Sequence, residues 1–201
     1  MKIKLYQNDI PSNLKLGLEV AIDTETMGLN PLRDKLCLVQ LSNGDGTCHL
    51  LKISNQSKPK NLLSILKNKK ILKIFHFARF DVAVFKHNYK ISINNIYCTK
   101  IASKLARTYT DKHGYKDLCK ELLNKTISKV EQSSDWGSDL TKQQKEYAAT
   151  DVLHLNKIKD KLEKILKREG RTKLAKSCFD FIEQRTNLDL QGWADQDIFK
   201  H

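Results

Sequence analysis

The sequence of 201 residues is poor in aromatic side chains, which make up 7% of it, and it holds five cysteines. So few aromatic residues argue against an extended surface on which bases would stack. An odd number of cysteines without a Cys-x-x-Cys pair indicates neither a disulfide framework nor a zinc knuckle. Most of the cysteines have apolar neighbours in the sequence, which predicts buried free thiols in a reducing compartment.

Long apolar runs are missing as well. Residues 1–6 meet a charge early and lack the apolar core of a signal peptide, and no later run is long enough to span a bilayer. We therefore expect a cytoplasmic protein without a membrane partner. No repeat, linker or low-complexity tract divides the chain, so residues 1–201 are expected to form a single domain.

Acidic residues are outnumbered by basic ones, and the formal net charge is +13. Such a charge predicts a polyanionic partner, most simply a nucleic acid. The same excess would also arise from lysines scattered over solvated helix faces. The charge alone therefore does not choose between a nucleic-acid-binding protein and a structural basic protein.

Hydrophobic periodicity predicts an α/β fold. We expect strands over residues 3–10, 19–25, 35–42, 47–53, 71–75 and 93–98. We expect helices over residues 61–68, 78–88, 99–107, 115–123, 141–167 and 172–184. The strands from the second to the fourth have short links and suggest an antiparallel meander. Strands and helices then alternate, which predicts a mixed sheet flanked by helices.

Local sequence patterns in the second half of the chain predict a loop, the start of a helix and a tail. Residues 129–139 are polar and predict a loop. Thr141 and Gln144 have the spacing of a capping box, which would begin the long helix that follows. Residues 186–201 form a tail beyond the last helix, and its apolar residues are Trp193, Ile198 and Phe199.

Two carboxylates end the strand over residues 19–25. Asp23 and Glu25 are one residue apart, and alternation along a strand places them on the same face. Two anionic groups held so close repel one another unless a cation lies between them. An exposed strand end with two solvated acids would show the same pattern, so the pair alone does not decide.

Two further stretches carry acids beside ordered elements. Asp81 follows the strand over residues 71–75 and opens a helix, where the helix dipole also favours an acid. Tyr147 and Asp151 are four residues apart on one helix and share a face, as they would on an ordinary surface helix. Each stretch taken by itself is more simply explained by local structure.

Four carboxylates and one tyrosine have the composition of a site for phosphodiester cleavage with two metal ions. Hard divalent cations such as Mg²⁺ or Mn²⁺ take oxygen ligands. Two such ions about 3.5–4 Å apart can flank a scissile phosphate. Tyr147 would orient the attacking water or accept its proton. We therefore predict as catalytic residues Asp23, Glu25, Asp81, Tyr147 and Asp151, and as metal ligands the four acids among them.

These motifs resemble those of the DEDDy branch of the DnaQ-like 3′–5′ exonucleases, and especially ribonuclease D. The order Asp-x-Glu, Asp and Tyr-x-x-x-Asp is present, and residues 134–136 and 140–152 are similar to the ribonuclease D signature. The match covers roughly residues 18–155. It implies an RNase H-like fold and a metal-dependent exonuclease.

The resemblance also implies a role for each acid. Asp23 would touch both metal ions. Glu25 and Asp151 would hold the ion on the side of the nucleophile. Asp81 would support the other ion, partly through water.

Within this family the chain is most similar to the short bacterial form called nanoRNase C. About fifty residues follow Asp151, too few for the pair of helical HRDC domains that ribonuclease D carries. The segment from His76 to Asp81 departs from the usual His-Asn-Ala-x-x-Asp, and it resembles nanoRNase C together with residues 107–114 and 197–201. This resemblance implies a ring-shaped homo-oligomer that cleaves dinucleotides at the end of RNA decay.

We hypothesise that a short RNA enters with its 3′ end at the acidic edge. Backbone groups near Thr24 and Thr26 would hold the terminal ribose, and a contact to the 2′-hydroxyl would favour RNA over DNA. Met27 or Leu29 would separate the last two bases, unless both are core residues. Further contacts are expected to a base from His76 and Phe77 and to phosphate from Arg79 and Arg107.

The tail over residues 186–201 has two interpretations. It would either cover the core of its own domain or dock on a neighbouring subunit. In the second case Lys200 or His201 would close the neighbour's site over the 5′ phosphate of the substrate. Two other functions remain compatible with the sequence: a general ribonuclease D-like exonuclease that trims longer RNA or DNA, and a non-catalytic nucleic-acid binding module.

Overall fold

The computed structural model describes residues 1–54, 57–127 and 134–201. Its sheet consists of β1 (Lys2–Gln7), β2 (Glu19–Thr26), β3 (Leu36–Ser42), β4 (Thr47–Lys52), β5 (Leu72–Phe75) and β6 (Ile96–Cys98). Its α-helices are α1 (Lys60–Lys67), α2 (Ala78–Tyr89), α3 (Thr99–Ala106), α4 (Tyr115–Leu123), α5 (Lys142–Leu153), α6 (Leu155–Arg168) and α7 (Thr172–Leu188). A π-helical turn, η1 (Asp189–Trp193), follows α7.

The sheet has six strands in the order β1-β4-β3-β2-β5-β6. β3 runs antiparallel to both β2 and β4, which confirms the predicted meander. β5 is parallel to β2 and to β6. β1 pairs in parallel with β4 at the edge of the sheet, a partner that the sequence did not indicate. All seven residues of β3 are buried, as expected for an apolar strand at the centre of a sheet. The predicted α/β fold with a mixed sheet is confirmed.

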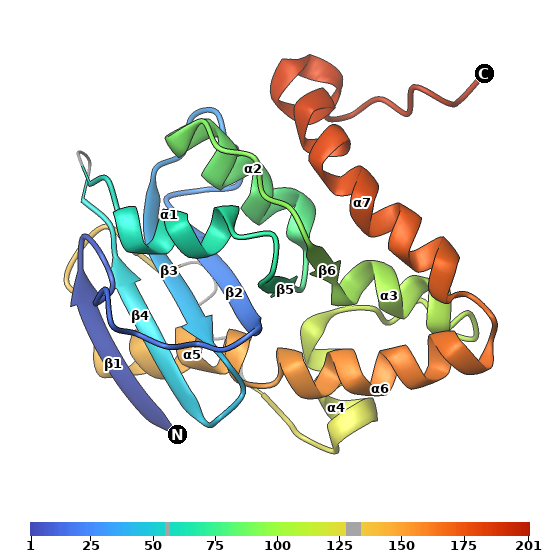
Figure 1. The fold of residues 1–201 in the computed structure, drawn as a ribbon, viewed down its shortest axis with the longest axis horizontal. Helices are drawn as coiled ribbons and strands as arrows, with labels where there is room; N and C mark the ends of the chain where they lie inside the picture. Colours follow the sequence, from blue (N-terminus) through green and yellow to red (C-terminus); the bar gives the residue numbers. More distant parts are fainter. Residues whose placement is uncertain (55–56, 128–133) are drawn as a thin grey trace.

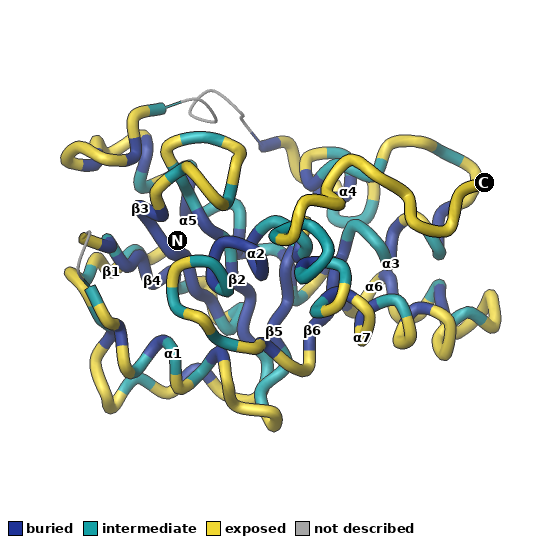
Figure 2. The backbone as a smooth tube through the Cα atoms, turned by 90° about the horizontal axis from the view of Figure 1, so that it is seen from above, coloured by how far each residue is buried: buried dark blue, intermediate teal, exposed yellow. Residues whose placement is uncertain are grey.

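Helices cover both faces of the sheet. Figure 1 shows α1 and α5 on opposite faces, and α5 contacts β2, β3 and β4. Beyond β6, α3, α6 and α7 pack against one another and form the right-hand part of the molecule in Figure 1. Figure 2 shows that the buried residues follow the strands and the helix faces turned toward them. The main core therefore lies between the sheet and its flanking helices.

The prediction of one helix over residues 141–167 is wrong in part. The structure has two helices there, α5 and α6, which are separated at His154, where φ is −110° and ψ is −5°. The predicted capping box is confirmed: Gln144 N–H donates to Thr141 Oγ1 over 3.1 Å, and Thr141 N–H donates to Gln144 Oε1 over 2.8 Å. Residues 129–133 of the predicted loop lie outside the described residues.

The cysteines are free, and all except Cys178 are buried, in agreement with the predicted thiols. Within the three described stretches, no helix combines the length and the apolar character that a membrane crossing requires.

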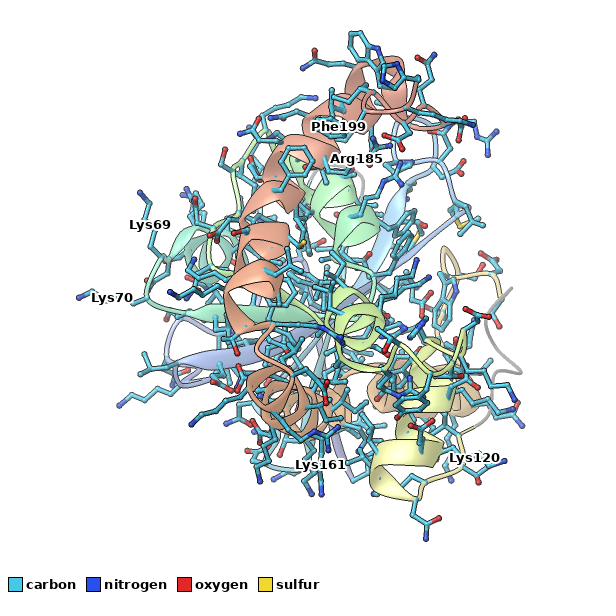
Figure 3. The ribbon with its side chains drawn as sticks, turned by 90° about the vertical axis from the view of Figure 1, so that its right-hand side faces the viewer. Lys69, Lys70, Lys120, Lys161, Arg185 and Phe199 are labelled. Carbon is cyan, nitrogen blue, oxygen red and sulfur yellow. The ribbon has the colours of Figure 1, made fainter. Side chains whose placement is uncertain are left out.

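The tail lies against the end of α7. Arg185 donates from its guanidinium to the carbonyls of Trp193 and Ala194 over 3.0 and 2.8 Å. Figure 3 shows Phe199 beside α7 near Arg185, and the rings of Phe181 and Phe199 are 6.4 Å apart. Phe199 nevertheless stays 78% exposed. The tail therefore does not bury its apolar residues in the core of its own domain.

Candidate active site

The C-terminal end of β2 presents the predicted pair of acids. Asp23 lies opposite Gln40 of β3, and Glu25 accepts a hydrogen bond of 3.4 Å from the Gln40 amide. The register between β2 and β3 shifts by a bulge between Glu25 and Thr26. Bulges bend a strand and redirect its side chains, and they are common beside active sites. The register shift therefore lies at the end of β2 from which Asp23 and Glu25 project.

Helix α5 brings the third carboxylate to the same place. Ala148 and Ala149 are completely buried, so the helix approaches β2, β3 and β4 closely. Oxygen atoms of Asp23, Glu25 and Asp151 all lie within 4.8 Å of one another. The structure thus brings together three of the four predicted metal ligands, although Asp151 is more than one hundred residues from the other two in the sequence.

The three carboxylates are unfavourable as a group of anions. Burial raises the pKa of Asp23 to about 7. Burial raises the pKa of Glu25 to about 10, and the charges of Asp23 and Asp151 contribute to that rise. Converging oxygen donors with this excess of negative charge fit a hard divalent cation. The residues present therefore suit the metal dependence of this kind of site.

Asp81 lies close by but outside this converging group. It is buried in the first turn of α2, and Thr24 Oγ1 donates to its Oδ1 over 2.7 Å. Burial, and after it the charge of Asp23, raise the pKa of Asp81 well above its usual range. Parallel β2 and β5 end at the same edge of the sheet, which explains why the helix after β5 reaches this position. Asp81 is thus placed behind the end of β2.

Tyr147 lies one turn before Asp151 on the same face of α5. Burial raises the pKa of its phenol, and the charges of Asp151 and Glu25 act in the same direction. The phenol therefore stays protonated near neutral pH and can donate a hydrogen bond. The ring centroid of Trp136 lies 6.0 Å from that of Tyr147 and supports one side of the ring.

A cleft of about 620 Å³ is lined by Asp23, Glu25, Tyr147 and Asp151, but not by Asp81. Met27 and Leu29 stand at its rim and are 52% and 87% exposed, so neither is a core residue. A Cβ atom on Gly137 would lie 3.1 Å from Met27 Sδ, which shows that Met27 reaches the segment before α5. The Thr26 hydroxyl donates to the carbonyl of Gly28 and holds the start of this loop.

Of the two residues predicted to contact a base, one lies in the cleft. His76 lines it, and its Nδ1 lies 2.9 Å from Thr99 Oγ1. Phe77 faces away into a neighbouring groove, where Lys100 Nζ lies 4.3 Å from the centre of its ring. Lys100 lines both the cleft and the groove.

The structure places both predicted phosphate-binding arginines outside the cleft lining. Arg79 pairs with Asp189 through two hydrogen bonds of 2.5 and 2.8 Å, so it fastens η1 to α2. Arg107 is completely buried and pairs with Glu121 of α4. A buried charge needs such a partner, and Arg107 has no surface from which to meet a substrate. The expectation that Arg107 contacts phosphate therefore finds no support in the geometry.

Lys100 and Tyr115 are among the residues of the cleft wall that sequence reasoning missed. Lys100 is the one lysine or arginine of the cleft lining among the described residues, and it is one of many lysines in the sequence. Tyr115 opens α4, and its burial depends on packing between helices that are distant in sequence. Trp136 lies in the segment that resembles the ribonuclease D signature. That resemblance was the sequence evidence that pointed to this part of the cleft wall.

Comparison with known proteins agrees with the fold and identifies the family. A model of the family described as 3′–5′ exonuclease matches residues 6–167. The chain therefore belongs to the 3′–5′ exonuclease family. It is similar to ribonuclease D of Nitrobacter hamburgensis, with 30% identity over 153 residues that cover 76% of this chain and 40% of that protein. The chain thus spans about two fifths of the length of this relative.

Solved structures narrow the comparison within the family. Brucella melitensis NrnC with bound Mg²⁺ is 52% identical with a TM-score of 0.95, and the match covers 100% of both chains. The same protein bound to pGG is 53% identical, with a TM-score of 0.96 and coverage of 100% and 99%. Escherichia coli RNase D is 26% identical with a TM-score of 0.74, covering 84% of this chain and 45% of that one. The predicted resemblance to the short nanoRNase C form is confirmed.

Proposed function

We propose that the protein is a two-metal-ion 3′–5′ exoribonuclease that hydrolyses short RNA, and dinucleotides in particular, to nucleoside 5′-monophosphates. The observation that carries this proposal is the convergence of Asp23, Glu25 and Asp151 beside Tyr147. The similarity to an NrnC structure bound to pGG supports a short substrate. Buried free cysteines agree with a reducing compartment, and we place the activity in the cytoplasm.

The acids would divide the work of holding two divalent cations, Mg²⁺ or Mn²⁺. Asp23 belongs to the converging group and its charge also raises the pKa of Asp81, so it would contact both ions. Glu25 and Asp151 would hold the ion next to the attacking water. Asp81 would reach the second ion from behind β2, partly through water. When bound, the ions supply an activated water and stabilise the leaving oxygen of the scissile linkage.

The remaining chemistry falls to Tyr147. Its phenol is protonated near neutral pH and lies on the same face of α5 as Asp151. A phenol in that position would orient the water for attack in line with the leaving 3′ oxygen. Loss of this hydroxyl would leave the metal ligands in place but misdirect the nucleophile.

The loop after β2 would set the length of the substrate. Met27 and Leu29 are exposed apolar side chains at the rim of an acidic cleft, and such side chains can insert between two bases. Backbone groups at Thr24 and Thr26 would hold the terminal ribose. His76 would lie beside a base, and Lys100 would meet a phosphate, since it lines the cleft.

We propose in addition that copies of the chain associate through α7 and the tail. A groove of about 570 Å³ between α3 and α7 is lined by Phe77, Ile101, Phe181 and Ile182. The tail beside it exposes Ile198 and Phe199. Exposed apolar patches of this kind mark protein interfaces. A second copy would cover both, consistent with a homo-oligomeric ring. Gel filtration at the mass of a monomer would contradict this proposal.

A digest of RNAs from two to twenty nucleotides, with Mg²⁺ or Mn²⁺, tests the enzymatic proposal. We expect the 5′-phosphorylated dinucleotide to be cleaved fastest and Asp23→Ala to release no nucleotide. An intact dinucleotide beside digested longer chains would instead support a general ribonuclease D-like exonuclease. If metal gave no release and Asp23→Ala behaved as the wild type, the protein would be a nucleic-acid binding module.

A further inference from the structure

Tyr115 connects the cleft wall to the catalytic helix. It begins α4, it is buried, and its ring forms part of the cleft lining. Its hydroxyl donates a hydrogen bond of 2.6 Å to the carbonyl of Thr150. Thr150 directly precedes Asp151. The contact therefore joins α4 to the part of α5 that carries a predicted metal ligand.

The acceptor, the carbonyl of Thr150, lies near the C-terminal end of α5, where backbone carbonyls lack hydrogen-bond donors. The last four carbonyls of a helix lack regular intrahelical partners, and Thr150 is among the last four residues of α5. The N–H of His154, which follows α5, bonds to the carbonyl of Val152. The Tyr115 hydroxyl thus supplies Thr150 with a donor from another helix.

The phenol oxygen also faces the break between α5 and α6. Burial raises the pKa of Tyr115, and a hydrogen bond from the backbone N–H of His154 acts in the opposite direction. The hydroxyl contacts α5 at the carbonyl of Thr150, four residues before His154. The contact therefore holds the last turn of α5, next to the break that hydrophobic periodicity did not reveal.

The rest of the Tyr115 side chain is held as well. Its ring lies 5.6 Å from the ring of His76, whose Nδ1 is 2.9 Å from Thr99 Oγ1. Thr99 Oγ1 in turn lies 3.2 Å from the carbonyl of Phe75, at the end of β5. Tyr115 is thus fixed against the sheet and can act as a rigid reference for α5.

We propose that Tyr115 is a positioning residue for the metal site. Its hydroxyl fixes the bend at His154 and, through it, the direction from which Asp151 approaches Asp23 and Glu25. Tyr147 shares a face of α5 with Asp151, so both would shift if the helix end changed direction. This inference rests on the proposed metal-dependent function and names a residue outside its ligand set.

Tyr115→Phe tests the inference, because it keeps the ring and removes the hydroxyl alone. Tyr97→Phe is the matched control: Tyr97 is also buried, and its hydroxyl has no hydrogen-bond partner among the described residues. We expect Tyr115→Phe to weaken Mn²⁺ binding about tenfold in calorimetry without substrate, since loss of a group that orients a ligand typically costs at least that much. kcat should fall by a similar factor with little change in KM, and Tyr97→Phe should bind Mn²⁺ as the wild type does.

A rescue separates positioning from simple packing. 4-Aminophenylalanine at position 115 keeps a donor in place of the hydroxyl, and we expect it to restore Mn²⁺ affinity. The inference is overturned if the two phenylalanine variants bind Mn²⁺ equally, or if Tyr115→Phe lowers Tm alone. If Tyr115→Phe does not fold, wild-type Mn²⁺ affinity in a folded Tyr115→His variant would overturn it. A wild-type protein that binds no Mn²⁺ would contradict the proposed function itself.

Discussion

The cleft at the end of β2 and the groove between α3 and α7 are similar in volume, about 620 and 570 Å³, but opposite in chemistry. The cleft gathers carboxylates whose pKa values burial raises. The groove gathers aromatic and aliphatic side chains, and it has no carboxylate among the described residues; its charged residues are Arg79, Lys100, Lys104 and Arg185. In a single chain without ligands, the carboxylates of the cleft repel one another and the apolar side chains of the groove are left uncovered. Cations would complete the first and an apolar surface the second, so one hollow is suited to chemistry and the other to assembly.

The largest effect is expected from removing one charge in the cleft. Asp23→Asn should lower exonuclease activity by at least about 10³-fold, the lower range expected when a central catalytic group is lost. The same change should stabilise the protein without metal, because the charge of Asp23 raises the pKa of Glu25. A stabilisation of about 1 kcal/mol corresponds to a rise in Tm of about 2–4 °C.

Asp180→Asn is the control for that charge. Asp180 is exposed on α7 and pairs with Lys176 at 2.7 Å, a surface interaction worth well under 1 kcal/mol. Activity and Tm should stay close to wild type, as followed by nucleotide release and thermal melting. An Asp23→Asn protein with wild-type activity would show that the cleft is not the site of the chemistry.

Substitutions at the groove should change the mass of the oligomer and leave metal binding in the cleft unchanged. Phe181→Ser and Phe199→Ser place a hydroxyl in the apolar contact at the groove, and we expect them to shift the oligomer toward smaller species in light scattering. Mn²⁺ binding should not change, because neither residue lines the cleft. Leu18→Ser, an exposed apolar residue on another surface, should leave the mass unaltered. Equal masses for all variants would show that the groove is not an interface.

A smaller effect is expected at the rim of the cleft. Leu29→Ala should raise KM for a dinucleotide about tenfold, because burial of a leucine side chain against the bases would contribute about 1.5–3 kcal/mol. Its Tm should barely move, because the side chain is 87% exposed and leaves no cavity. Leu32→Ala, in the same loop but outside the cleft lining, should change neither quantity. Steady-state kinetics and melting curves measure both, and equal KM values for the two variants would exclude a role for Leu29 in separating bases.

The smallest effect is a dependence of Tm on pH. A carboxyl whose pKa is higher in the folded than in the unfolded state stabilises below its unfolded pKa and loses that contribution as pH rises. For Asp23 the loss should occur between about pH 4 and 7. Saturating Mg²⁺ should offset it, so the metal-induced rise in Tm should be larger at pH 8 than at pH 6. An equal rise at both values would mean that metal does not displace protons from these acids.

The sequence predicted the positions of helices and strands better than it predicted which strands and side chains contact one another. Period-two and helical patterns located β2, β3 and β4, and motif spacing selected the acids that converge in the cleft. The pairing of β1 with β4 depends on a contact between segments more than forty residues apart, which no local pattern encodes. The same limit applies to Arg107, because its partner Glu121 lies on another helix. The break at His154 has no glycine or proline to mark it.

The two edges of the sheet limit how copies of this chain can meet. One edge is β6, which is three residues long and contacts both α3 and α7. The other edge is β1, where Lys2 and Lys4 are exposed. Short strands and edge lysines discourage the addition of a strand from another molecule, which is a common route to aggregation. An assembly of this protein is therefore expected to join helical surfaces and to leave its sheets separate.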